Sequence, residues 1–266
     1  MIGVVTDLLV VAGASLLVAV GAMTVTALVA RRLGRVNVVD VTWGLALVAV
    51  ATVCALISPT WEAWLLVGLV TVWGGRLSWH ILARSRGEGE DPRYAAILGD
   101  GGFRTAVRKV FVVQGAAVWL VSLPLQAAAV TDVNWPWACV LGVAVWAAGV
   151  YFEVVGDRQL AAYRARPRDQ RPPVLDTGLW GWTRHPNYFG DALVWWGIWL
   201  TGALSAGWLV ALVTVVAPLT MTHFLRNVTG AKLIERTMSQ RPGWDEYAAR
   251  VPLFVPRPPR SVTPRD

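Results

Sequence analysis

Long runs of hydrophobic residues, separated by shorter polar segments, dominate the chain. Runs long enough to cross a membrane fall at about residues 7–30, 38–57, 61–82, 109–130, 135–156, 188–206 and 208–226. A helix needs about 20 apolar residues to cross the hydrocarbon of a bilayer, and it satisfies its own backbone hydrogen bonds where no water is present. The pattern therefore predicts an all-α fold, a polytopic membrane bundle of about seven transmembrane helices.

Basic residues are present in every second segment that connects these runs. The first, third and fifth connections and the C-terminal segment are rich in arginine, with one lysine each in the third connection and the C-terminal segment, whereas the second, fourth and sixth connections contain neither residue. Positively charged loops are retained on the cytoplasmic side of a membrane. We therefore expect the N-terminus outside and the C-terminus in the cytoplasm. We also expect one helical domain over residues 1–256 and a disordered, Pro- and Arg-rich cytoplasmic tail over residues 257–266.

Composition agrees with a membrane protein. Of the 266 residues, 55% are hydrophobic and only 15% are charged, whereas a soluble domain carries about a quarter charged residues. The mean hydropathy is +0.50. The net charge of +7 lies in connections that face a membrane, so we expect no nucleic-acid partner. Cys54 and Cys139 lie in apolar runs, and three His are too few for a His-rich site, so we expect no metal.

Two ionisable residues lie within the predicted spans. Asp40 is near the start of the second span, and Arg76 lies deep in the third. An isolated charge in a membrane costs a few kcal/mol, so such residues are candidates for function. Two interpretations stay open: a structural ion pair, or a pair that lines a substrate pocket.

The segment GLWGWTRHPNYFGD, residues 178–191, is the richest in polar chemistry. Thr183 can cap a helix that has Pro186 in its first turn. The residues at i, i+3, i+4 and i+7 then share one face of that helix: Arg184, Asn187, Tyr188 and Asp191. A cation, an amide, a phenol and a carboxylate on one stripe can bind phosphates and hydroxyls. The alternative is an anchor at the lipid headgroups.

Two further polar stripes flank this segment. Glu153 and Asp157 lie four residues apart at the end of the fifth span, and Arg164 continues close to the same face. Like charges at that spacing destabilise a helix unless another group uses them. The Arg-rich stretch that follows, residues 164–171, suits anionic lipid or a polyanionic cofactor. Glu235 precedes WDEYAARVPLFVP, which predicts an amphipathic helix.

These stretches closely resemble the steroid 5-alpha-reductase-like membrane proteins. The C-terminal signature of that family is matched by TGLWGWTRHPNYFGDALVWWG, and its uncharacterised bacterial branch by DVTWG, WGGRLSWHILARSRGEGEDPRY and FEVVGDRQL. The resemblance extends over about residues 40–256. It implies a protein integral to the bacterial plasma membrane that holds NADPH in a cavity facing the cytoplasm. Its partners would be the lipid bilayer and a hydrophobic small-molecule substrate that enters from it.

The resemblance also implies roles for individual residues. Asp157, Asn187 and Asp191 would contact the cofactor, and further contacts would come from Glu153, Arg164, Arg171, Arg184, His185, Tyr188 and Glu235. In the steroid reductases, a Glu of the second span and a Tyr of the third polarise the carbonyl of an enone. In this chain Asp40 lies near the position of that Glu. Trp73, followed by Arg76, lies at the position of that Tyr. Because an indole cannot act as a general acid, Tyr94 or Arg76 would have to replace the Tyr.

Three functions are compatible with the sequence. The leading hypothesis is an oxidoreductase that uses NADPH to reduce a C=C bond of a lipid, sterol-like or isoprenoid substrate, with Asp40, Arg76 and Trp73 lining the acceptor pocket. The motif RHPxY also occurs in isoprenylcysteine carboxyl methyltransferases, so the second is an S-adenosylmethionine-dependent methyltransferase of a membrane-embedded substrate. The third is a non-catalytic lipid-binding membrane protein. The substrate and the oligomeric state stay open.

Overall fold

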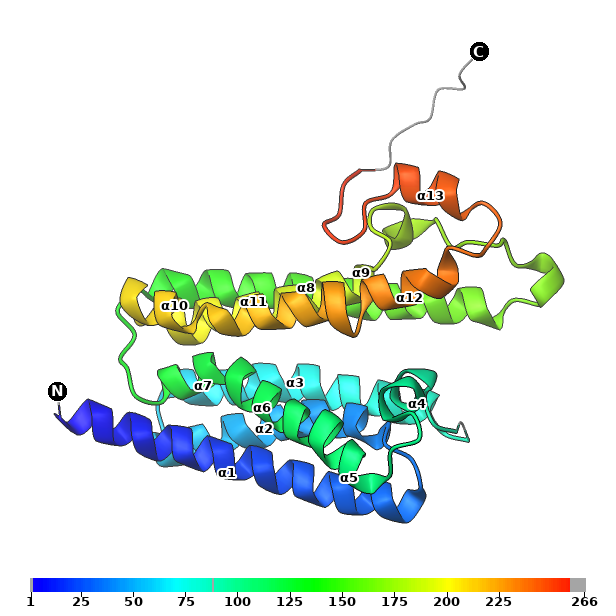
Figure 1. Ribbon diagram of the computed structural model, residues 1–266. Helices are drawn as coiled ribbons and strands as arrows, with labels where there is room; N and C mark the ends of the chain where they lie inside the picture. Colours follow the sequence, from blue (N-terminus) through cyan, green and yellow to red (C-terminus); the bar gives the residue numbers. More distant parts are fainter. Residues whose placement is uncertain (1, 88, 259–266) are drawn as a thin grey trace. The chain divides into compact units, whose positions relative to one another are not determined.

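A computed structural model describes residues 2–87 and 89–258, and these residues form helices and connections without any strand (Figure 1). The prediction of an all-α fold is therefore confirmed. The chain divides into two compact units. Unit 1 comprises Met1–Leu141 and Ile198–Ala217, and unit 2 comprises Gly142–Gly197 and Pro218–Asp266. Neither unit is one continuous stretch, and the single domain expected over residues 1–256 stays a prediction.

Unit 1 is built on long helices joined by short connections. α2 packs against α1 and α3, and α1 also packs against α6. The backbones of α2 and α3 touch at Gly44 and Gly74, because a Cβ on Gly44 would lie only 2.5 Å from the carbonyl oxygen of Gly74. Its elements are α1 (Ile2–Leu33), α2 (Val38–Ile57), α3 (Trp61–Arg84), α4 (Pro92–Leu98), α5 (Phe103–Ala106), η1 (Val107–Phe111), α6 (Val112–Val121), α7 (Leu123–Ala128), the start of α8 (Pro136–Ala165), η4 (Leu200–Leu204) and α10 (Trp208–Thr214).

Unit 2 pairs most of α8 with α9 (Pro186–Trp199). A Cβ on Gly190 of α9 would lie 2.5 Å from the carbonyl oxygen of Gly149 and 2.6 Å from the amide nitrogen of Glu153. The two backbones are therefore in contact, which brings the polar side chains of both helices into the same region. The other elements are η2 (Arg168–Gln170), η3 (Gly178–Gly181), most of α11 (Val216–His223), η5 (Phe224–Val228), α12 (Ala231–Met238) and α13 (Trp244–Arg250).

Five helical stretches are long and apolar enough to cross a membrane: Val5–Leu33, Val38–Ile57, Trp61–Arg84, Pro136–Ala165 and Trp208–Met238. They correspond to five of the seven predicted runs. The runs at residues 109–130 and 188–206 are largely helical too, but the first breaks between α6 and α7 and the second passes into the π-helical η4. By length and composition these helices belong to an integral membrane protein. The count of seven and the orientation stay predictions.

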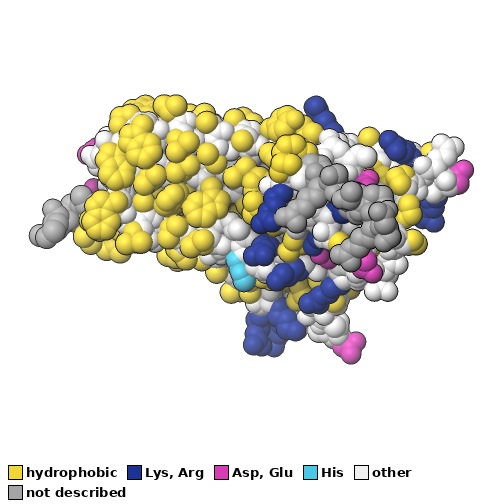
Figure 2. Space-filling view, turned by 90° about the horizontal axis from the view of Figure 1, so that it is seen from above, with side chains coloured by type: hydrophobic (Ala, Val, Ile, Leu, Met, Phe, Trp, Pro, Cys, Tyr) yellow, Lys and Arg dark blue, Asp and Glu magenta, His cyan; other side chains and the backbone are white. Residues whose placement is uncertain are grey.

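The surface of these helices is apolar, as lipid contact requires. Leu17, Val140 and Val213 each expose more than 70% of their area. Figure 2 shows hydrophobic side chains over much of the visible face, with Lys and Arg gathered toward one end of it. Soluble proteins seldom expose so much contiguous apolar surface.

α13 and the segment after it belong to unit 2. Trp244 and Tyr247 of α13 form a small buried core with Val174 and Val251. The predicted helix is present over Trp244–Arg250, whereas the following residues VPLFVP are not helical. Disorder is expected over residues 257–266, of which residues 259–266 lie outside the described part of the chain. The amide nitrogen of Arg257 donates to the carbonyl oxygen of Trp182 at 2.9 Å.

Candidate functional site

The motif RHPNY leads directly into α9, which begins at Pro186. Proline suits this position because its fixed φ is helical and its missing N–H would have had no partner there. We expected Thr183 to cap this helix. Instead, the buried Thr183 hydroxyl donates to the carbonyl oxygen of Phe254 at 2.8 Å and accepts only a long bond, 3.4 Å, from the amide nitrogen of His185. Thr183 therefore fastens the segment before α9 to the C-terminal region.

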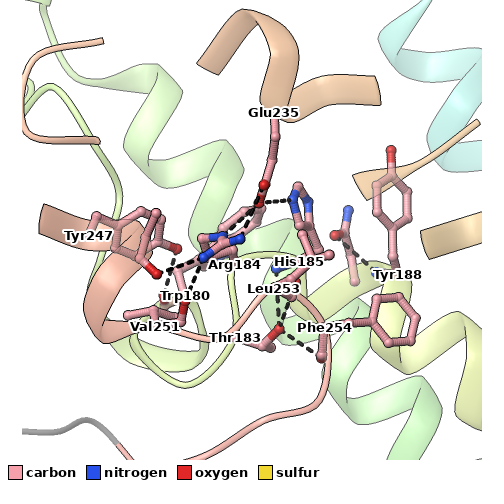
Figure 3. Close-up of polar contacts among 12 residues, drawn as sticks. Trp180, Thr183, Arg184, His185, Tyr188, Glu235, Tyr247, Val251, Leu253 and Phe254 are labelled. Carbon is pink, nitrogen blue, oxygen red and sulfur yellow. Dashed lines mark hydrogen bonds and ion pairs between the residues drawn. The ribbon is translucent and has the colours of Figure 1, made fainter. Parts of the chain in front are cut away.

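Arg184 is the centre of the polar contacts in Figure 3. Its Nε donates to Oε1 of Glu235 at 2.6 Å, and its Nη2 donates to Oε2 at 3.1 Å. Nη1 donates to the carbonyl oxygens of Ala248 and Val251 at 2.9 and 2.8 Å. Four donors of the guanidinium group are therefore engaged within the protein, and Arg184 joins α12 to the end of α13.

Glu235 also binds the neighbouring histidine. Nε2 of the buried His185 lies 3.1 Å from Oε1 of Glu235, and the His185 ring stacks on Tyr188 at 5.7 Å between ring centroids. A single carboxylate of α12 thus fixes both residues that precede Pro186. The Tyr247 hydroxyl donates to the carbonyl oxygen of Trp180 at 2.8 Å, and burial raises the pKa of Tyr247.

α8 and α9 bring together the residues expected to hold the cofactor. Nδ2 of Asn187 donates to Oδ1 of Asp157 at 3.2 Å. Glu153 and Asp191 are both buried, with 3% and 7% of their areas exposed. Gly156 allows this approach, because a Cβ there would meet the ring of Pro186 and the amide nitrogen of Asn187. Buried carboxylates and an amide on two touching helices are suited to the hydroxyl and amide groups of a dinucleotide, so these residues fit NADPH chemically.

Arg164 and Arg171 lie together at the end of α8. Nη2 of Arg171 donates to the carbonyl oxygens of Arg164 and Arg166 at 2.5 and 2.7 Å. The Arg171 guanidinium also lies over the ring of Tyr163, 5.4 Å from its centroid. The predicted basic segment is therefore ordered around one fixed arginine.

A second polar cluster lies in unit 1, around Asp40. Nη2 of Arg93 is 3.1 Å from Oδ2 of Asp40, and the Tyr94 hydroxyl donates to Oδ1. Burial, and then the charge of Asp40, raise the pKa of Tyr94, so this phenol keeps its proton at neutral pH. A carboxylate, a guanidinium and a protonated phenol thus meet where α2 begins.

The connection between α3 and α4 holds this cluster in place. Glu90 accepts hydrogen bonds from the amide nitrogens of Val36 and Asn37, the second at 3.0 Å. Asp91 caps α4 by accepting from the amide nitrogen of Arg93 at 2.8 Å. Burial alone would raise the pKa of Asp91, but the hydrogen bonds from Arg93 outweigh it and lower that pKa. Two adjacent acidic residues therefore anchor α4 to the start of α2.

A family model matches residues 26–251, and its description is a protein of unknown function, DUF1295. The chain belongs to the DUF1295 family. No curated protein and no solved structure gives a significant match. The matched region of this DUF1295 chain contains both polar clusters, from Asp40 to Glu235.

The two other residues expected in the acceptor pocket of this DUF1295 chain lie on α3. Trp73 is completely buried, next to Gly74, whose backbone touches that of α2. Arg76 follows within the same turn. Asp40 forms an ion pair with Arg93, and the pairing of Asp40 with Arg76 stays a prediction.

From the sequence, Tyr94 was considered only as a substitute acid. Arg93 and Glu90 were not predicted to belong to the cluster around Asp40. A local signal was present: Asp91 followed by Pro92 is a typical helix start, an N-cap followed by a proline in the first turn. A helix there places Tyr94 in its first turn. The pairing with Asp40, 54 residues earlier, had no such signal.

Proposed function

We propose that this DUF1295 protein is an integral membrane reductase that uses NADPH to reduce a C=C bond of a lipid, sterol-like or isoprenoid substrate. In this proposal the chain crosses the membrane seven times, with its N-terminus outside and its catalytic side facing the cytoplasm. The observation that carries the proposal is the contact between Tyr94 and Asp40: a buried, protonated phenol held by a carboxylate at the start of a membrane helix.

The residues of unit 2 would bind the dinucleotide. Asp157, Asn187 and Asp191 offer acceptors and an amide to ribose hydroxyls and to the carboxamide of the nicotinamide, with Glu153 and Tyr188 beside them. NADPH, when bound, supplies a hydride. Arg184, His185 and Glu235 would position this region, since they bind one another.

The residues of unit 1 would handle the proton. The Tyr94 hydroxyl turns from Asp40 to the substrate and donates its proton, and Arg93 stays bound to Asp40 so that the carboxylate is not left unpaired. Asp40 acts as a positioning residue in this scheme. Trp73 and Arg76 on α3 complete the expected acceptor pocket.

Ligand-induced stabilisation of the purified protein tests the cofactor. We expect NADPH to raise the free energy of unfolding by about 2.7 kcal/mol at 100 times its dissociation constant. Asn187→Ala and Asp191→Asn should abolish the shift, while Asp245→Asn, on the exposed side of α13, should keep it. Retention of the shift in both site variants would remove the support for this cofactor site.

The same experiment distinguishes the alternatives. The segment 184–188 has the form RHPxY, which the methyltransferases of membrane-embedded substrates also carry. Stabilisation by S-adenosylmethionine and not by NADPH would favour a methyltransferase. Stabilisation by neither would favour a non-catalytic lipid-binding protein.

A further inference from the structure

A groove of about 370 Å³ lies between α1 and α2 of unit 1, which pack against each other (Figure 1). Most of the side chains in its walls are aliphatic. The lining residues are Gly21, Ala22, Val25, Thr26 and Val29 of α1 and Val38, Thr42 and Leu45 of α2. Val25 and Leu45 expose 62% and 52% of their areas, so the groove opens on the apolar surface of the helices.

The floor of the groove is unfilled and offers few polar contacts. Gly21 is exposed, and a Cβ there would meet nothing within 4 Å. The Thr26 hydroxyl donates to the carbonyl oxygen of Ala22 at 2.7 Å, and the Thr42 hydroxyl lies 2.9 Å from it. The two hydroxyl groups of the groove are therefore engaged within the protein. The remaining surface suits a hydrocarbon chain better than a polar ligand.

An arginine lies at one end of the groove. Arg32 follows Val29 by three positions and Val25 by seven, so it shares their face of α1. Arg31 points elsewhere, since its guanidinium lies over the ring of Phe103, 5.4 Å from the centroid. Arg32 is exposed, and over the described part of the chain no carboxylate lies within ion-pair distance of it. The apolar groove thus ends at a cation whose counter-charge must come from outside the protein.

The length of the groove matches one leaflet of a bilayer. Gly21 and Arg32 are eleven positions apart in α1, which is roughly 16 Å along a helix. The hydrocarbon of one leaflet is about 15 Å thick, half of the bilayer core. The long side chain of arginine reaches from the end of a helix to the headgroups. A phospholipid can therefore place an acyl chain in the groove and its phosphate at Arg32 at the same time.

The groove is separate from the polar cluster around Asp40. Successive residues of a helix are rotated by about 100°, so Asp40 lies on the side of α2 opposite to Val38 and Thr42, which line the groove. On that opposite side Asp40 binds Arg93 and Tyr94. A ligand in the groove would not contact this cluster, and the groove is therefore not the expected acceptor pocket.

We propose that the groove binds one anionic phospholipid of the leaflet that contains the Arg32 end of α1. One acyl chain lies between α1 and α2, and Arg32 binds the phosphate, because a guanidinium matches two oxygens of one phosphate. An anionic headgroup leaves that phosphate without a cation of its own, whereas the amine of a zwitterionic headgroup competes with Arg32 for it. The lipid fills a space between two helices that no side chain fills. The proposal does not rest on the reductase function.

Lipid binding by the full-length protein in detergent tests the site, by native mass spectrometry and by thermal stabilisation. The probes are phosphatidylglycerol and phosphatidylcholine with the same acyl chains, and glycerol phosphate, which has no chains. We expect phosphatidylglycerol to bind about tenfold more tightly than phosphatidylcholine, the effect of one charge-assisted hydrogen bond, and glycerol phosphate to cause no stabilisation. Equal affinity for the two lipids would overturn the proposal, and so would binding of glycerol phosphate as tight as that of phosphatidylglycerol.

Two pairs of matched variants locate the effect. Arg32→Gln should remove the preference for phosphatidylglycerol, whereas Arg31→Gln, the same charge change one residue away on another face, should keep it. Gly21→Leu fills the groove and should weaken binding of both lipids about tenfold. Gly13→Leu is its control, because Gly13 is an exposed position of α1 outside the groove where a Cβ also meets nothing within 4 Å.

Two further results would contradict the proposed lipid site. Equal loss of the preference in Arg31→Gln and Arg32→Gln would mean that net charge alone attracts the lipid. Dimerisation of the wild type that Gly21→Leu abolishes and Gly13→Leu retains, without any lipid preference, would make the groove a contact between two copies of the chain. If Gly21→Leu does not fold, the exposed Arg32 and Arg31 variants still decide the question. None of these measurements uses NADPH, so failure of the lipid site is distinguishable from failure of the proposed function.

Discussion

Arg184 and Glu235 are joined by two parallel hydrogen bonds, although 51 residues separate them in the chain. This pair links the segment before α9 to α12, and the remaining Arg184 contacts extend the link to the end of α13. The segment that carries RHPNY is therefore held by the Glu235 side chain and by backbone carbonyls from the C-terminal part of unit 2.

Breaking this pair should destabilise the protein strongly. Glu235→Gln leaves a largely buried guanidinium with part of its donors unpaired, and we expect a loss of roughly 2–4 kcal/mol in the free energy of unfolding. The exposed pair of Arg250 with Asp176 is the control, because Asp176→Asn should cost less than about 1 kcal/mol. Thermal unfolding in detergent measures both, and equal losses would contradict a structural role for Glu235.

Tyr94 should be required for proton transfer but not for cofactor binding. If the proposed reductase function holds, Tyr94→Phe should lower the rate of reduction by about 10²–10⁴ and leave the NADPH-induced stabilisation unchanged. Tyr151→Phe is the control, because Tyr151 is an exposed residue of α8. Full activity of Tyr94→Phe would exclude Tyr94 as the acid.

Alkaline pH should destabilise the protein through its buried tyrosines. Burial raises the pKa of Tyr94 and Tyr247, so the folded protein keeps protons that the unfolded chain releases above about pH 10. The resulting stability is fully present below the ordinary tyrosine pKa and is lost as the pH rises through it. Melting temperatures recorded between about pH 9 and 11 should fall less steeply in Tyr247→Phe than in the wild type.

Glycine-to-alanine substitutions should have opposite effects at two helix positions. At Gly190 the new Cβ would collide with the backbone of α8, and we expect a loss of about 1–3 kcal/mol. At Gly68 of α3 nothing lies within 4 Å of the new Cβ, so alanine should stabilise the helix by about 0.5–1 kcal/mol. Chemical or thermal unfolding of the two variants shows the sign of each effect, and a tolerated alanine at Gly190 would contradict the close contact of α8 with α9.

The sequence predicts the local features of this protein well. The length of the apolar runs is enough to predict the all-helical fold and the five candidate spans, because each run depends only on neighbouring residues. Asn187 of one predicted stripe does meet Asp157 of the other, but α9 begins only at Pro186, so Arg184 lies outside the helix face on which the stripe placed it.

The partners of polar residues across the fold could not be predicted in the same way. Helical periodicity shows which face a side chain occupies, but it does not show which distant element covers that face. Arg184 is bound by Glu235 of α12, and Asp40 by Arg93 and Tyr94 of α4. These pairings depend on tertiary packing, which one sequence without its structure does not contain.

The bonds from Thr183 and Arg184 to the carbonyl oxygens of residues 252–254 also constrain how the protein is made. Helix α9 leaves the ribosome well before these acceptors are translated, and at ordinary elongation rates several seconds separate the two events. During that interval the segment that leads into α9 remains unfastened. A premature stop codon shortly before residue 252 would therefore yield a chain that contains all five candidate spans but lacks both acceptors of the RHPNY segment.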